Sequence, residues 1–144
     1  MSNFINNDAK LLYDMIISLN KTIVNDSRQA AKREFSIINE GTLINYCNSI
    51  FSYKPFSTEL LCESFEEGVA YTIYHLNKGH CFSDGNKRTT FAVTMLFIET
   101  FGKVNFDTEF FSGVLAMFLV YMLDNNISEK QVYEWVKKQF SSKF

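Results

Sequence analysis

The sequence has few residues that break or constrain a chain: its 144 residues include one proline and six glycines. This scarcity excludes a collagen-like chain, and the 47% hydrophobic content excludes a disordered tail or a flexible linker. The three cysteines, Cys47, Cys62 and Cys81, are an odd number and show no C-x-x-C spacing. We therefore expect neither a disulfide framework nor a zinc site, and a reducing, cytoplasmic compartment fits best.

An excess of positive charge is also missing, since 14 basic residues meet 16 acidic ones and leave a net charge of −2. Proteins that bind nucleic acid or anionic membranes through charge carry a basic face, so we expect neither partner. The longest apolar run, 110–123, is interrupted by Ser112 and Gly113 and is too short to cross a bilayer. The polar N-terminus does not have the pattern of a signal peptide.

Large apolar side chains at helical spacing are abundant, including 15 phenylalanines and seven tyrosines. The length fits one domain over residues 1–144 with a core of its own. Because almost nothing alternates with period two, we predict an all-α bundle of about six helices. The expected helices cover about 8–24, 42–51, 58–78, 85–101, 108–123 and 128–140. The most apolar of them, 108–123, is expected at the centre of the bundle.

Two short patterns predict helix ends, and one predicts a turn. Gly79 is expected to end the third helix, because glycine tolerates left-handed backbone geometry. Ser128 and Gln131 have the spacing of a capping box at the start of the last helix. Residues 53–56 contain the single proline and predict a turn or a small β-hairpin.

The stretch H-C-F-S-D-G-N-K-R-T-T, residues 80–90, concentrates the residues that carry chemistry. It lies where one helix is expected to end and another to begin. The first N–H groups of a helix have no internal partner, and the helix dipole makes that end positive, so it can bind phosphate. Gly85 lets the backbone approach an anion closely, and Lys87 and Arg88 add two positive charges.

Two further groups in this stretch suggest group transfer. Asp84 is a hard oxygen ligand suited to Mg²⁺, which typically binds one or two carboxylates together with substrate phosphates. His80 can take a hydroxyl proton near neutral pH. Base, carboxylate and phosphate site together predict transfer from a nucleotide to a hydroxyl, although neither a Walker A loop nor a protein-kinase glycine-rich loop occurs.

The pattern His80-x-Phe82-x-Asp84-Gly85-Asn86-Lys87-Arg88 resembles the signature of the Fic/Doc family, most closely its Doc (death-on-curing) branch. The wider Fic signature reads H-x-F-x-[D/E]-G-N-G-R-x-x-R. Here Lys87 replaces the second glycine and Phe91 the last arginine, as in the Doc branch. The resemblance implies a Fic/Doc-type helical bundle that binds ATP and Mg²⁺. The implied roles are general base for His80, loop anchor for Phe82, metal ligand for Asp84, and phosphate binding for Gly85, Asn86, Lys87 and Arg88.

The resemblance also implies a function. Doc-type proteins are toxins of toxin–antitoxin systems that transfer the γ-phosphate of ATP to a threonine of elongation factor Tu, and a separate antitoxin silences them. We therefore expect a kinase-type toxin that phosphorylates a protein hydroxyl. Two alternatives stay open: a Fic-type AMP transferase, and a catalytically idle domain that binds a partner. Retention of His80 and Asp84 argues against the idle domain.

Two further segments have alternative interpretations. In the family a β-hairpin flap precedes the motif helix and pairs with the extended target. Tyr53, Lys54, Pro55 and Phe56 are placed either to form such a flap or to make a plain connection. Residues 36–41 match the [ST]-x-x-x-E-[GN] pattern of self-inhibited Fic proteins, in which a glutamate pairs with the arginine that Phe91 replaces here. A separate antitoxin is therefore favoured over self-inhibition through Glu40.

Overall fold

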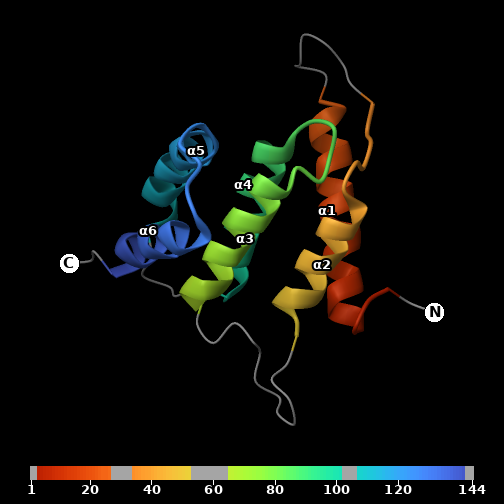
Figure 1. The fold of residues 1–144 in the computed structure, drawn as a ribbon, viewed down its shortest axis with the longest axis horizontal. Helices are drawn as coiled ribbons and strands as arrows, with labels where there is room; N and C mark the ends of the chain where they lie inside the picture. Colours follow the sequence, from red (N-terminus) through yellow and green to blue (C-terminus); the bar gives the residue numbers. More distant parts are fainter. Residues whose placement is uncertain (1–2, 27–33, 53–64, 102–106, 142–144) are drawn as a thin grey trace.

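The computed structural model describes residues 3–26, 34–52, 65–101 and 107–141, which form six helices (Figure 1). The helices are α1 (Asn7–Val24), α2 (Glu40–Ile50), α3 (Phe65–Gly79), α4 (Asn86–Phe101), α5 (Thr108–Asp124) and α6 (Glu129–Ser141). Within these residues the β-type pairing is one isolated antiparallel bridge, between Ile37 and Phe82. The all-α prediction is confirmed. The predicted turn at 53–56 and the predicted helix start at 58–64 lie outside the described residues.

Side chains cap several helices at the positions where local sequence favours them. The side chain of Asn6 accepts a hydrogen bond from the N–H of Ala9 at the start of α1. At the start of α6, the N–H of Gln131 donates to Ser128 Oγ (3.2 Å), and the N–H of Ser128 donates to Gln131 Oε1 (2.9 Å). The predicted capping box is therefore confirmed, because both reciprocal bonds are present.

The central helix is α3, not α5. α3 packs against α2, α4, α5 and α6 and lies between the α1–α2 pair and the α5–α6 pair (Figure 1). α5 buries one side and leaves Phe110, Met117 and Tyr121 exposed, with Met117 75% accessible. The prediction of a central α5 is wrong, because mean hydropathy counts apolar residues without saying which of them another helix covers. α3 is less apolar, but Gly68 and Ala70 let neighbouring helices approach it.

The core consists of two apolar clusters on opposite sides of α3 and α4. The first cluster joins α3 and α4 to α5 and α6, and it includes Ile73, Phe111 and Val136. The second joins α1 and α2 to α3, α4 and the segment between them, and it includes Ile16 and Phe82. Phe97 of α4 packs against both clusters, so the two sides of the bundle meet at one aromatic ring.

Two helical glycines are expected to respond oppositely to replacement by alanine. A Cβ on Gly68 would lie 2.5 Å from Phe97 Cζ, so Gly68→Ala forces the ring to move and should destabilise the fold by about 1–3 kcal/mol. A Cβ on Gly113 of α5 would meet nothing within 4 Å, so Gly113→Ala should stabilise by about 0.5–1 kcal/mol. Urea denaturation measures the change in the free energy of unfolding for both variants. Changes of the same sign would contradict the close packing of α3 on Phe97.

Candidate active site

The motif residues lie in the connection between α3 and α4, residues 80–85, and in the first turn of α4; the connection reaches the side of α1 (Figure 1). Two residues of this connection have left-handed backbone geometry, His80 with φ 49° and Gly85 with φ 76°. His80, rather than Gly79, has the left-handed geometry at this helix end, although α3 does end at Gly79 as predicted. A Cβ there would lie 2.9 Å from Thr42 Cγ2, so close packing against α2 accounts for this glycine.

The backbone around His80 is held by the segment that precedes α2. A non-glycine residue in the left-handed region costs about 1–2 kcal/mol, so it needs contacts that fix it. Asn39 Nδ2 donates to the carbonyl oxygen of His80 (2.8 Å) and to that of Gly79 (3.2 Å). The N–H of Ile38 donates to the carbonyl oxygen of Cys81 at 2.8 Å. These contacts position the His80 side chain, which is exposed to solvent.

Phe82 lies within the connection and contacts both the core and the start of α4. Its ring is buried in the second core cluster. Its N–H donates to Asn86 Oδ1 (3.0 Å), and its carbonyl oxygen accepts from Asn86 Nδ2 (2.7 Å). The side-chain amide of Asn86 therefore clamps the loop, and it also lies 3.4 Å from His80 Nδ1. The side chain of Asn86 is thus occupied within the loop, and its backbone N–H lies at the start of α4.

The start of α4 has the features of an anion site. The N–H of Thr89 donates to the carbonyl oxygen of Gly85 at 2.8 Å, which is the first bond of the helix. The three N–H groups before it have no acceptor within the helix. Lys87 and Arg88 are exposed, and the first turn of α4 contains no acidic residue. Cations at this end oppose the helix dipole, so an anion between them would relieve an unfavourable arrangement.

Asp84 is the carboxylate of the loop, and its Oδ1 accepts a hydrogen bond from the N–H of Gly85 at 2.8 Å. No group of three or more His, Cys, Asp or Glu side chains suited to a metal occurs in the described residues. Mg²⁺ usually binds few protein carboxylates and completes its coordination with substrate phosphates and water. The carboxylate of Asp84 is of the ligand type that such an ion uses.

Asn20 of α1 is a further residue at the loop, and sequence reasoning missed it. It is 0% exposed, and its Nδ2 donates to the carbonyl oxygen of Asp84 (2.9 Å) and to Thr89 Oγ1 (3.0 Å). Among the described residues its buried Oδ1 meets no hydrogen-bond donor, and an unsatisfied buried acceptor costs about 1–3 kcal/mol. Its position in the sequence could have indicated its burial, because Asn20 lies midway between Ile16 and Val24 on the buried side of α1.

The two described cysteines, Cys47 and Cys81, are poor nucleophiles. Burial raises the pKa of the Cys81 thiol to about 11 and that of the Cys47 thiol to about 12. Since the thiolate is the reactive form, both cysteines remain unreactive near neutral pH. Glu40 begins α2 and accepts a hydrogen bond from the Tyr13 hydroxyl at 2.6 Å. Burial, followed by the effect of Glu40, raises the pKa of Tyr13 to about 12.

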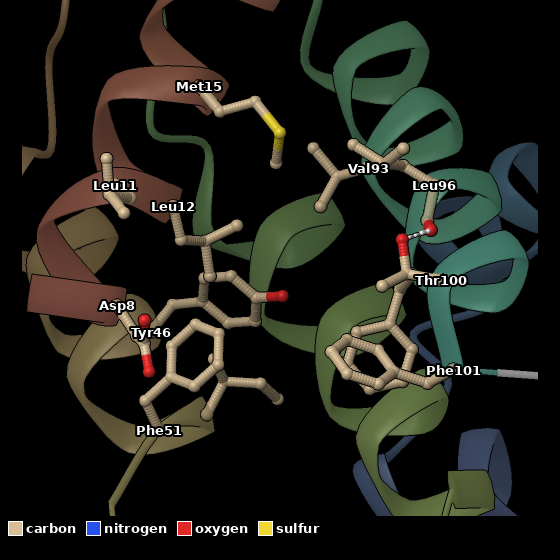
Figure 2. A pocket seen from close by; sticks show the side chains of 12 residues that line it. Asp8, Leu11, Leu12, Met15, Tyr46, Phe51, Val93, Leu96, Thr100 and Phe101 are labelled. Atoms are coloured by element: carbon tan, nitrogen blue, oxygen red, sulfur yellow. Dashed lines mark hydrogen bonds between the residues drawn. The ribbon is translucent and has the colours of Figure 1, made fainter.

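A cavity of about 760 Å³ lies elsewhere, between α1, α2 and α4. Figure 2 shows Leu12, Tyr46 and Phe51 on one side of it, and Val93 and Phe101 on the other. The lining is mostly apolar and includes no residue of the motif. This cavity therefore lacks the cations and helix N-terminus of the anion site. The proposed flap residues Tyr53, Lys54, Pro55 and Phe56 lie outside the described residues.

Comparison with known proteins identifies the class. Residues 10–98, more than half of the chain, match the model of the Fic/DOC family. The chain therefore belongs to the Fic/DOC family. Membership indicates a Fic-type transferase that acts on protein targets; family members generally transfer groups such as AMP to protein hydroxyls. No curated protein and no solved structure matches the chain. Among the described helices, none combines the length and apolar character needed to cross a membrane.

Proposed function

We propose that the protein is a Doc-type kinase toxin that transfers the γ-phosphoryl group of ATP to a hydroxyl of a target protein. The observation that carries this proposal is the pair of departures from the Fic signature. Lys87 puts a charged side chain where the signature has bare backbone. Phe91, in place of the last arginine, packs against the first core cluster. The position therefore supplies no cation to a nucleotide, which supports a nucleotide placement different from that of AMP transferases.

In the proposed reaction, His80 takes the proton of the target hydroxyl. The hydroxyl oxygen bonds to the γ-phosphorus, the bond to the bridging β–γ oxygen breaks, and ADP leaves. Bound ATP with Mg²⁺ supplies the phosphoryl group and a divalent charge, and Asp84 is the carboxylate that would hold the metal. Lys87, Arg88 and the N–H groups at the start of α4 offset the charge of the phosphates.

The lone pair of the imidazole is engaged by Asn86 in this structure, so the ring must change its contacts before it can act as a base. Asn86 Nδ2 can only donate, so its 3.4 Å contact with His80 Nδ1 leaves the proton of the neutral ring on Nε2. That contact is long and the ring is exposed, so turning the ring requires little energy. A target hydroxyl entering the site is therefore proposed to replace Asn86 as the partner of the ring.

Labelled ATP tests the assignment directly. The protein is incubated with cell extract, Mg²⁺ and ATP labelled at either the α or the γ phosphate, with His80→Ala as the inactive control. We expect label on protein from γ-labelled ATP and none from α-labelled ATP. Label from the α phosphate would instead establish the second candidate, AMP transfer, which the family match favours. Label from neither would contradict both transferase functions.

The proposed target and partner follow from the Doc resemblance. The target would be a translation elongation factor, identified by mass spectrometry of the labelled band. Inhibition is proposed to come from a separate antitoxin. In support, Glu40 is hydrogen bonded to Tyr13, and the arginine that it would need is replaced by Phe91.

A further inference from the structure

The side-chain amide of Asn20 has one orientation that its surroundings permit. A backbone carbonyl oxygen can only accept hydrogen bonds, so the contact with Asp84 requires Nδ2 of Asn20 to face it (2.9 Å). The same nitrogen donates to Thr89 Oγ1, in the first turn of α4 (3.0 Å). The buried side-chain amide of Asn20 therefore links Asp84 to the first turn of α4.

Gly85 is also in close contact with this amide. A Cβ on Gly85 would lie 3.2 Å from Asn20 Nδ2 and 3.2 Å from Ile23 Cγ2. α1 is thus the surface on which the loop rests. Because Asp84 Oδ1 accepts from the N–H of Gly85, the carboxylate follows the backbone that Asn20 holds.

We infer that Asn20 is a positioning residue, which fixes the Asp84 carboxylate and the Gly85 backbone in the geometry that receives a metal-bound nucleotide. The inference rests on the proposed function for the identity of the ligand. The hydrogen bonds themselves belong to the protein without ligand, so they can be tested independently of activity.

The chain offers a matched control in Asn77 of α3. Asn77 is also buried, and its Nδ2 donates to the carbonyl oxygen of Leu119 (3.0 Å). Its Oδ1 meets no donor in the part of the chain that the structure describes. Asn20→Leu and Asn77→Leu therefore make the same chemical change, but only Asn20 touches the motif loop.

Amide hydrogen exchange of Gly85 and Thr89 is measured by NMR in the ligand-free full chain. The Kd for MgATP is measured by calorimetry, with both variants well below their melting temperatures.

Losing the hydrogen bonds to Asp84 and Thr89 should speed exchange at Gly85 and Thr89 and raise the Kd for MgATP, each by about tenfold, in Asn20→Leu alone. Equal exchange rates in the two leucine variants would overturn the inference. If Asn20→Leu does not fold, the same measurements are made on Thr89→Val, which removes one of the two acceptors of Asn20 Nδ2. Unchanged exchange rates at Gly85 and Thr89 in this variant would overturn the inference. Failure of the unaltered chain to bind MgATP would count against the proposed function, while the exchange data would still decide the role of Asn20.

Discussion

Replacing His80 with alanine is expected to lower phosphoryl transfer roughly 10²–10⁴-fold, the contribution typical of a positioned general base. The imidazole is the one histidine side chain in the motif, and it is exposed where a target hydroxyl can reach it. Label transfer from γ-labelled ATP to extract proteins measures the loss. Binding of MgATP should remain, because the proposed phosphate contacts come from other residues.

Backbone geometry requires a second variant at this position. His80 has a φ of 49°, which alanine adopts less readily than asparagine does. His80→Asn therefore keeps the left-handed conformation accessible while removing the basic nitrogen. We expect it to be as inactive as His80→Ala and closer to the unaltered chain in melting temperature. Transfer at the original rate in His80→Asn, or growth arrest at equal expression, would show that the imidazole is not the base.

Replacing Lys87 with glycine restores the Fic pattern at this position and should reduce γ-phosphoryl transfer by about tenfold or more. The variant loses a cation from the start of α4 and opens space beside its first N–H groups. Any residual activity should shift toward transfer of the α-labelled group. The ratio of label from α- and γ-labelled ATP measures this shift.

Lys87→Ala distinguishes the effect of the lost charge on γ-phosphoryl transfer from the effect of the opened space, because it removes the cation and keeps a Cβ. Lys138, in the last turn of α6 and outside the motif, provides the control for general loss of charge. Removing a cation that opposes the helix dipole should leave stability unchanged or raise it by about 0.3–1 kcal/mol. Unchanged γ-transfer in Lys87→Gly would show that this lysine does not set the orientation of the nucleotide.

Local sequence was sufficient to predict the helices and the motif. The 3.6-residue period located each helix, and the capping box at Ser128 and Gln131 formed as its spacing indicates. The composition did not reveal which helix is central, because α5 is apolar around most of its circumference while its neighbours cover one side. Burial depends on packing partners, and periodicity within a single helix does not identify them.

The contacts that shape the loop were beyond sequence reasoning for a different reason. Asn20 is 64 residues from Asp84, and a polar side chain at a buried helical position has no characteristic pattern that names its partner. Asn39 immediately precedes α2, and its side chain donates to the backbone carbonyl oxygens of Gly79 and His80 rather than capping that helix. Both residues serve the motif from other parts of the chain.

The division of the core into two clusters affects how the protein can be shortened. The family-defining stretch ends at residue 98, inside α4, but Val69 and Ile73 of α3 are covered from the other side by α5 and α6. A fragment cut at that boundary would leave this side of α3 in water, with Phe97 at its edge. Expression of the motif by itself, or its transfer into another scaffold, therefore has to retain α5 and α6 or replace the apolar side chains that these helices cover.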